Sequence, residues 1–402
     1  MRSHCRYASG LVAGFLLLLV AFFAANTRID PLWVTPSPWT DPGFAPYKQI
    51  YRSLRTAKAG MVTAEPWDFA VAGSSRVAAA FDPTEPAWSG HHGINLGLWA
   101  GSITENAAMV AYALDHQPSL RRIFVGLDLN DFSSSYDLRS VTGFASSPLN
   151  PRNDNLEYDL RKYVGISTFT ASIATWNSRR ALEPAPFTPQ GFWRNPIGGR
   201  GFRSMFRSDS APVALRTAKS RRHTPEVSSV KMAAVRDILA AGRHHQVEIT
   251  LFLTPDHAAT AAIPAILEVQ DPFFFTERSA LTRLVAEENQ AHPDTPPVSL
   301  WDFTGFDSAN TEAIPAGPTA SAHWWIDGIH GSPKLGDLMI SRMLQPSSTP
   351  SSQDNYGCIL LPESLSSRER EISLGYATYR STHARDWEWV SSLVLKDQGG
   401  GF

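Results

Sequence analysis

Short, continuous apolar runs alternate with helix-like segments through the middle of the chain. The apolar runs cover residues 67–72, 122–127, 247–253 and 297–303, and residues 92–97 offer a further strand end. The helix-like segments cover 107–114, 229–241 and 334–343. Strands that are buried on both faces read as continuous apolar runs, and they occur in parallel sheets covered by helices. The alternation therefore predicts an α/β fold, a three-layer α/β/α sandwich with a central parallel sheet. Ligands of such sheets bind beyond the carboxyl ends of the strands.

The N-terminus carries a second strong signal. Arg2 and Arg6 precede an uncharged apolar run over residues 8–27. About 20 apolar residues, rising about 1.5 Å each, cross a hydrocarbon core of about 30 Å. The basic flank places the N-terminus in the cytoplasm, so the run predicts a retained transmembrane helix with the remaining chain exported. The alternative is a cleaved signal peptide, but cleavage after Ala24 or Ala25 would place a phenylalanine at the −3 position.

These patterns divide the chain into four predicted parts. Residues 1–28 form a cytoplasmic stub and anchor, and residues 29–64 form a stalk rich in proline and aromatic residues. Residues 65–345 form the α/β domain with a long insertion at 132–226, and residues 346–402 form a linker and a partly disordered tail. The net charge of -2 gives no general attraction to nucleic acid. Two cysteines, Cys5 and Cys358, are too few for a disulfide framework or a thiolate metal site.

A glycine–serine–serine sequence ends the first predicted strand. Gly73 permits a tight turn into a helix, which would lift the hydroxyl of Ser75 to the edge of the sheet at a helix N-terminus. Serine is also a common residue at the start of helices, where it caps free amides. The motif alone therefore supports either a nucleophile or a helix cap.

A second motif, Asp327–Gly–Ile–His330, lies in the loop before the last predicted helix. The carboxylate can accept a hydrogen bond from the imidazole Nδ1–H, which leaves Nε2 free to take a proton from a serine hydroxyl. Alternatively, Asp327 caps the helix and His330 is a surface histidine. A zinc site built on His323 and His330 lacks a convincing third ligand, so we expect no metal and no cofactor.

In this order and context the motifs resemble the SGNH/GDSL hydrolase superfamily. The closer resemblance is to bacterial membrane-anchored relatives of proteins that work beside membrane O-acyltransferases, namely the alginate O-acetylation proteins and the teichoic-acid D-alanine transfer protein. The resemblance implies that Ser75 is the nucleophile, with Ser74 in place of the usual aspartate, and that Asp327 and His330 complete a triad. It also implies that Gly97, in Asn–Leu–Gly, donates its backbone N–H to the oxyanion.

The third block of that family departs from the usual pattern. The family has Gly–x–Asn, whose side-chain amide is an oxyanion donor, whereas this chain has Gly–Leu–Asp128, with Asn130 two positions later. An ionised Asp128 would repel an oxyanion. Three alternatives follow: Asn130 substitutes, Asp128 is protonated, or hydrolytic power is reduced.

Three further residues have polar side chains suited to substrate binding. His257 follows the fourth predicted strand and would line the cleft, although a simple loop histidine is the alternative. Arg203 and Arg207 belong to a basic stretch with interleaved aromatic residues, which suits an anionic glycan or a lipid headgroup. The alternative for this stretch is a solvated face of the insertion.

The resemblance leads to two hypotheses of function. In the first, the protein is a serine esterase or acyltransferase that moves acyl groups, in particular acetyl, on a cell-envelope polysaccharide. In the second, the fold is a non-catalytic scaffold or glycan-binding partner of a membrane O-acyltransferase or a polysaccharide export system. Both place a single-pass protein in a bacterial inner membrane with its α/β domain on the periplasmic or outer side. The triad favours the first hypothesis and Asp128 favours the second.

Overall fold

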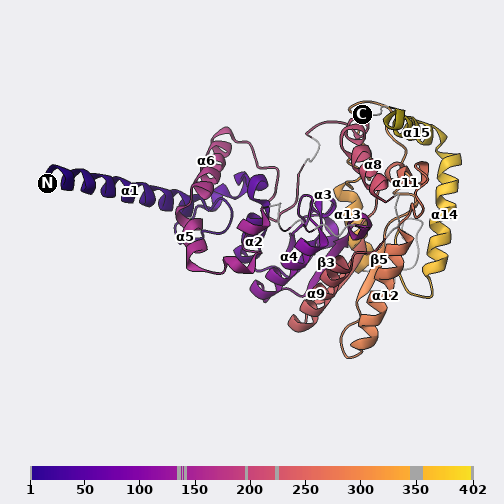
Figure 1. Cartoon of the computed structure of the whole chain (residues 1–402), viewed down its shortest axis with the longest axis horizontal. Coiled ribbons are helices and arrows are strands. Elements are labelled where there is room, and N and C mark those ends of the chain that lie inside the picture. The colour runs from indigo at the N-terminus through magenta and orange to yellow at the C-terminus, as the bar shows by residue number, and fades with distance from the viewer. Residues whose placement is uncertain are drawn as a thin grey trace. The chain divides into compact units, whose positions relative to one another are not determined.

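The computed structural model describes residues 2–133, 137, 139, 143–194, 198–221, 226–344 and 356–399 (Figure 1). The chain divides into two compact units. Met1–Pro66 and Arg139–Arg194 form one, which we call the N-terminal unit. Trp67–Leu138 and Asn195–Phe402 form the other, which we call the sheet unit.

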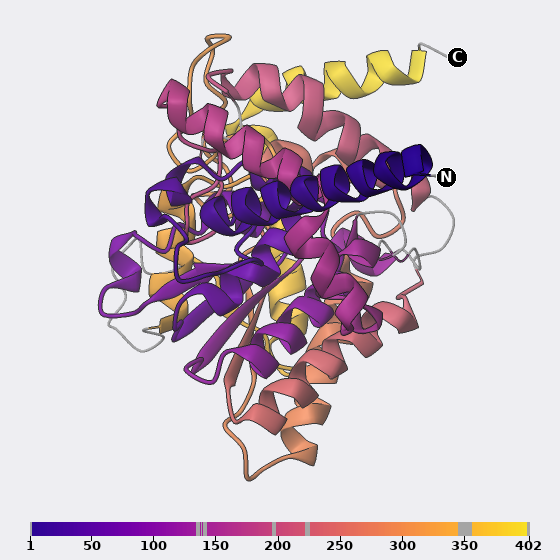
Figure 2. The same cartoon turned by 90° about the vertical axis from the view of Figure 1, so that its left-hand side faces the viewer.

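The sheet unit is built on a six-stranded sheet in the order β2-β1-β3-β4-β5-β6 (Figure 2). Its strands are β1 (Phe69–Ala72), β2 (Gly93–Asn95), β3 (Arg122–Leu127), β4 (Glu248–Leu253), β5 (Ser299–Asp302) and β6 (Cys358–Ile359). Strands β1 to β5 pair in parallel, and β6 pairs with β5 in the antiparallel sense. The expectation of an α/β fold with a mainly parallel sheet is confirmed.

Helices surround this sheet. They are α3 (Ser75–Ala80), α4 (Ile103–His116), α7 (Phe202–Met205), α8 (Ala211–Ser220), α9 (Ser229–His245), α10 (Ala258–Ala261), α11 (Ile263–Ile266), α12 (Phe275–Ala291), α13 (Pro333–Leu344), α14 (Leu365–Thr382) and α15 (Ala384–Gly399). Helix α4 begins with a capping box made by Ser102 and Glu105. Helix α4 packs against α9, and α3 packs against α13.

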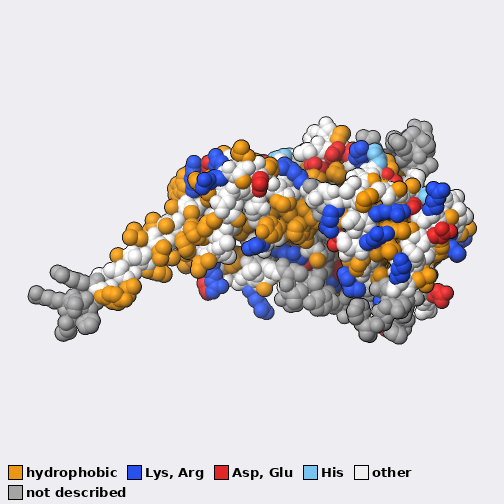
Figure 3. Space-filling view, turned by 90° about the horizontal axis from the view of Figure 1, so that it is seen from above, with side chains coloured by type: hydrophobic (Ala, Val, Ile, Leu, Met, Phe, Trp, Pro, Cys, Tyr) orange, Lys and Arg blue, Asp and Glu red, His pale blue; other side chains and the backbone are white. Residues whose placement is uncertain are grey.

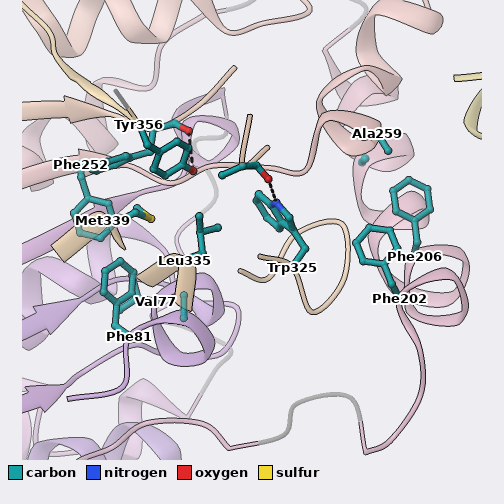
Figure 4. Packing of buried hydrophobic residues seen from close by; sticks show 14 of the residues in the cluster. Val77, Phe81, Phe202, Phe206, Phe252, Ala259, Trp325, Leu335, Met339 and Tyr356 are labelled. Carbon is teal, nitrogen blue, oxygen red and sulfur yellow. Dashed lines mark hydrogen bonds between the residues drawn. The ribbon is translucent and has the colours of Figure 1, made fainter. Parts of the chain in front are cut away.

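The core of the sheet unit positions α3, the helix that carries Ser75. Val77 of α3 and Phe81, the residue after this helix, lie beside Leu335 and Met339 of α13 in one buried cluster (Figure 4). The two helices approach closely, because a Cβ added to Gly336 would lie 1.9 Å from the carbonyl oxygen of Ala80. Close packing of this kind tolerates little displacement, so the first turn of α3 is fixed relative to the sheet.

The N-terminal unit consists of helices and short turns. Its helices are α1 (Arg2–Ile29), α2 (Leu54–Ala64), α5 (Leu156–Val164) and α6 (Ile166–Ala181). Within α1, Tyr7–Ile29 has 23 residues and a mean hydropathy of 2.4, which is long and apolar enough to cross a membrane. Figure 3 shows hydrophobic side chains along this helix, and none of its apolar window is buried by the protein.

Two predicted segment boundaries differ from the structure. Residues 29–64, expected as a stalk, belong to a compact unit together with part of the insertion, where the buried Lys58 side chain donates to the carbonyl of Gly191. Within the predicted tail, residues 358–399 supply β6, α14 and α15 to the sheet unit, while residues 346–355 lie outside the described residues. Both segments are held by contacts between residues far apart in the chain, which a local pattern cannot reveal.

Candidate active site

Ser75 is the first residue of α3, directly after β1 and a tight turn. A Cβ on Gly73 would lie 2.4 Å from Cγ2 of Val77, so the turn needs glycine. Ser74 caps the helix, because its Oγ accepts a hydrogen bond from the Arg76 amide at 3.3 Å. The capping role therefore belongs to Ser74, which leaves the hydroxyl of Ser75 available for other partners.

Ser75, His330 and Asp327 form a continuous chain of hydrogen bonds. Ser75 Oγ lies 3.0 Å from His330 Nε2. His330 Nδ1 lies 2.8 Å from Asp327 Oδ2. These distances are within reach for proton transfer from a hydroxyl to an imidazole held by a carboxylate. The fold thus unites two motifs that the sequence separates by 255 positions.

The Asp327 carboxylate is buried but well bonded. Its Oδ1 accepts from the amides of Ile329 at 2.7 Å and His330 at 2.8 Å, and the side chain is 1% exposed. Burial opposes ionisation, but the attraction of His330 and these hydrogen bonds outweigh it, so the pKa of Asp327 lies below its ordinary value. Asp327 therefore remains a carboxylate, as the orienting member of a triad must.

Ser210 also holds Asp327, and the sequence analysis missed this residue. Its Oγ donates to Asp327 Oδ1 at 3.2 Å and accepts from the Gly328 amide at 3.0 Å. Ser210 is fully buried at the end of a π-helical turn, Phe206–Ser210, between α7 and α8. Such turns often occur at functional sites. Ser210 precedes Asp327 by 117 positions in the sequence, so no local motif predicts their contact.

Arg76, the residue after Ser75, joins two carboxylates. Its Nη1 lies 2.6 Å from Asp256 Oδ1, and its Nε lies 3.6 Å from Asp128 Oδ1. Burial alone would lower the pKa of Arg76, but these carboxylates outweigh it and raise the pKa above its ordinary value. Asp128 also accepts from Thr254 Oγ1 at 2.6 Å. The carboxyl group of Asp128 therefore lies beside a cation, Arg76, which no local sequence pattern indicates.

The backbone N–H of Gly97 is not directed at the site, which corrects the expectation of an oxyanion donor there. It donates to Asn95 Oδ1 at 2.8 Å, and the Asn95 amide donates to the carbonyls of Val77 and Phe81. A Cβ on Gly97 would lie 2.4 Å from the amide nitrogen of Ala78. Glycine is required here because the end of β2 packs against α3.

A cavity of about 70 Å³ lies beside the triad loop. Ile329, between Asp327 and His330 in the sequence, and Arg76 line it, and Asn130 is one of its polar lining residues. Most of the other lining residues are apolar, including Phe273 and Phe306. The cavity therefore combines mainly apolar walls with polar and charged groups, among them Arg76, Asp256 and Arg278, and small-molecule sites likewise combine the two kinds of lining. Asn130 lines this cavity, whereas Asp128 does not.

His257 is a structural residue in this fold and has no nitrogen left for a substrate. Its Nε2 donates to the Glu312 carbonyl at 2.8 Å, and its Nδ1 accepts from the Ala259 amide at 3.1 Å. The ring is fully buried, which lowers the pKa of His257 to about 4. The loop-histidine alternative therefore describes this residue, and the substrate-binding role is withdrawn.

The neutral His257 predicts a stability that depends on pH. An unfolded chain protonates the imidazole near pH 6.5, whereas the folded protein protonates it near pH 4. Between these values only the unfolded state gains a proton, so the free energy of unfolding should fall as the pH drops, by about 3 kcal/mol in total. Urea denaturation at pH 7 and pH 5 should detect about 2 kcal/mol of this change. The His257→Asn variant, which keeps an acceptor for the Ala259 amide, should lack this contribution; an unchanged slope would contradict the assignment.

Arg203 and Arg207 lie against the C-terminal helix α15. Their guanidinium groups stand 4.6 and 5.5 Å from the ring centre of Trp389. Both line a groove with Ser204 and Ser208, and the same segment leads to Ser210. Within the described ranges, no group of three or more His, Cys, Asp or Glu side chains is placed to hold a metal ion.

Comparison with known proteins leaves the family open. No protein-family model matches the chain, and no curated protein matches it. Among solved structures, one similar chain is described as "a putative platelet activating factor from Streptococcus pneumonia". The two chains are 12% identical over 74% of this chain and 91% of the other, with a TM-score of 0.32. A similarity of this size supports no statement about fold or activity.

Proposed function

We propose that the protein is a serine esterase or acyltransferase of the SGNH type. The observation that carries the proposal is the hydrogen-bond chain from Ser75 through His330 to Asp327. Its substrate would be an acyl group, in particular acetyl, on a cell-envelope polysaccharide, as the resemblance of the motifs implies.

The arrangement of the sheet supports the corresponding fold, a three-layer α/β/α sandwich. The strand order β2-β1-β3-β4-β5 is the order of flavodoxin-like folds. A Cβ on Gly242 of α9 would lie 2.3 Å from Ile249, and a Cβ on Gly126 would meet Val77 of α3 and Phe252. Ile249 and Phe252 are three positions apart in β4 and so point to opposite faces. Helices α9 and α3 would then cover the two faces.

The proposed chemistry follows from the positions of the three side chains. Ser75 Oγ attacks the acyl carbon while His330 Nε2 takes the hydroxyl proton, and Asp327 stabilises the resulting imidazolium. The bond between the acyl carbon and the leaving oxygen then breaks, and His330 returns the proton to that oxygen. In the second step water or a sugar hydroxyl attacks the acyl-Ser75 ester while His330 takes its proton. The bond between the acyl carbon and Ser75 Oγ then breaks, and His330 returns the proton to Ser75 Oγ.

The N-terminal helix supports a membrane-anchored location for this reaction. Thr27 Oγ1 accepts from Trp39 Nε1 at 2.9 Å, and the Thr27 carbonyl accepts from Ser37 and Thr40. Cleavage before Thr27 would leave this fully buried residue as a chain end. We therefore infer a retained anchor. The resemblance of the motifs and the basic N-terminal flank further imply a bacterial inner membrane, an α/β domain on the periplasmic side and a membrane O-acyltransferase as partner.

A second function is favoured by specific features of the site. The Gly97 amide is occupied by Asn95, and Asp128 stands where the family has an asparagine. A fold with a triad and few oxyanion donors would turn over slowly, because such donors supply much of the rate. In that case the protein acts as a scaffold or glycan-binding partner, with Arg203 and Arg207 as cations for an anionic glycan.

Hydrolysis of p-nitrophenyl acetate by the full chain in detergent separates the two functions. An enzyme should release nitrophenol, and Ser75→Ala should remove this activity. The neighbouring Ser74→Ala variant is the matched control, because it removes a serine that only caps the helix. Release that is equal in all three proteins and in buffer would reject the esterase and leave the scaffold.

A further inference from the structure

Helix α5 and the start of α6 carry a group of exposed apolar side chains. Leu156 and Ile166 are each 73% exposed, and Leu160 is 54% exposed. Together with Val164 and Gly165 they line a shallow groove, which the ion pair of Glu157 and Arg161 borders. Single exposed apolar residues are ordinary, but a contiguous group of this kind marks an interaction site.

This group lies next to the apolar helix α1. The ring of Phe22 stacks on Phe169 of α6 with ring centres 4.2 Å apart, and Phe23 lies 5.9 Å from Tyr163 of α5. Figures 1 and 2 show α5 and α6 beside the end of α1. Both phenylalanines belong to Tyr7–Ile29, the segment long enough to cross a membrane. If α1 spans the bilayer, the residues in contact with Phe22 and Phe23 lie at the depth of the span.

Asn26, the polar residue of this contact, has its amide group hydrogen-bonded within the protein, as a lipid environment requires. Asn26 is fully buried, its Nδ2 donates to the Tyr163 carbonyl at 2.9 Å, and its Oδ1 accepts from Ser172 Oγ at 2.9 Å. Within a bilayer no water can satisfy such an amide, so the protein must do so. Helices α5 and α6 supply both partners.

The two ends of α6 lie at different positions along α1, and so at different depths in a membrane that α1 spans. Phe169 contacts Phe22, and the later residue Ser172 contacts the later residue Asn26. The start of α6 therefore lies toward the apolar middle of α1, and its end lies away from it. Leu182, which follows the last residue of α6, is 74% exposed and is separated from Ile166 by about 24 Å of helix.

We propose that α5 and the start of α6 lie in the membrane interface, with Leu156, Leu160 and Ile166 inserted among the lipid acyl chains. The neighbouring positions of α5 are charged: Arg161 pairs with Glu157, and Lys162 pairs with Asp159. An apolar face beside a charged face is the pattern of helices that lie in the plane of the interface, where basic side chains reach the headgroups. This inference goes beyond the proposed acyl chemistry and does not depend on it.

Depth-dependent fluorescence quenching tests the proposal in the full chain. Cys5 and Cys358 are replaced by serine, and single cysteines are introduced as Leu16→Cys, Leu160→Cys, Ile166→Cys or Leu182→Cys and labelled with bimane. Each protein is placed in lipid nanodiscs, where both membrane faces are accessible. Quenching by a nitroxide on the lipid acyl chain is compared with quenching by aqueous iodide. Leu182 is the matched control, since it is 74% exposed, close to the 73% of Ile166, and belongs to the same unit.

The proposal predicts that the labels at 160 and 166 are quenched by the lipid nitroxide at least about threefold more strongly than the label at 182, as for groups buried about 5–10 Å into the interface. Iodide should show the reverse order. Lipid quenching at 16 with iodide quenching at 160 and 166 would overturn the proposal while leaving α1 as a span. Iodide quenching at 16 as well would overturn both. Circular dichroism identifies any variant that fails to fold. Leu160→Gln, combined with the label at 166, provides a second test: with unchanged thermal unfolding, it should weaken lipid quenching at 166.

Discussion

Replacing His330 by alanine should lower kcat for a small acyl ester by about a thousandfold or more, as removal of a triad member does in serine hydrolases. His330 Nε2 lies 3.0 Å from Ser75 Oγ, and no other imidazole nitrogen among the described residues has a hydrogen bond to that hydroxyl. Without it the hydroxyl proton has no acceptor. Ser75→Ala should be equally damaging, because the two residues act as one unit. The measurement is steady-state kinetics of the full chain in detergent.

The other members of the site should rank below His330. Asp327→Asn keeps an acceptor toward the His330 ring and should lower kcat less than His330→Ala does. Ser210→Ala acts only through Asp327, and we expect a loss of about tenfold in kcat with little change in KM. If Ser210→Ala raised KM and left kcat unchanged, its positioning role would be wrong. If His330→Ala were as active as the unaltered protein, the triad would not be catalytic.

The second large effect concerns Asp302, at the end of β5. Its buried carboxylate accepts from Arg278 Nε at 3.0 Å and from Arg368 Nε at 3.2 Å, and it binds the Thr304 amide and hydroxyl. Burial opposes ionisation, but the two guanidinium groups outweigh it and lower the pKa of Asp302 to about 2. Asp302→Asn would leave two buried cations without their shared carboxylate, so the free energy of unfolding should fall by about 3–5 kcal/mol.

Asp307→Asn is the matched control for this change. Asp307 also pairs with Arg368, at 3.2 Å, but its side chain is 30% exposed and Asp302 remains in place. We expect a loss below about 1 kcal/mol, as for exposed ion pairs. Urea denaturation of both variants provides the comparison. Equal losses, or a loss below about 1 kcal/mol for Asp302→Asn, would show that Asp302 does not anchor α14 to the sheet.

The sequence was most informative where structure is local. Strands β1, β3, β4 and β5 were predicted because buried parallel strands are continuous apolar runs, and β2 was predicted within residues 92–97. The helix α1 was predicted from its length and hydropathy. The two parts of the triad were also visible, because Gly73–Ser75 and Asp327–His330 each follow a local geometric rule. Their meeting at 3.0 Å depends on the fold and could only be inferred from the order of the motifs.

Features that depend on distant partners were not predictable. Strand β6 has two residues and is defined by its pairing with β5. The Gly97 amide was expected to face the site, but it donates to Asn95 Oδ1, and the Asn95 side chain is held in place by the carbonyls of Val77 and Phe81, 18 and 14 positions earlier. Ser210 lies in a π-helical turn, and the spacing of hydrophobic residues in the sequence does not predict this turn. The Gly97 amide and the Ser210 hydroxyl each have several possible hydrogen-bond partners. Only the packing of the folded chain decides which partner each of them takes.

Reaction with a fluorophosphonate tests the central claim most directly, because this reagent forms a covalent adduct only with an activated serine. The full chain in detergent is treated with the probe, and the modified peptide is identified by mass spectrometry. We predict a single adduct on Ser75 that is absent from Ser75→Ala and His330→Ala but present in Ser74→Ala. No adduct on the folded protein, or an adduct on another serine that persists in Ser75→Ala, would contradict the proposed enzyme.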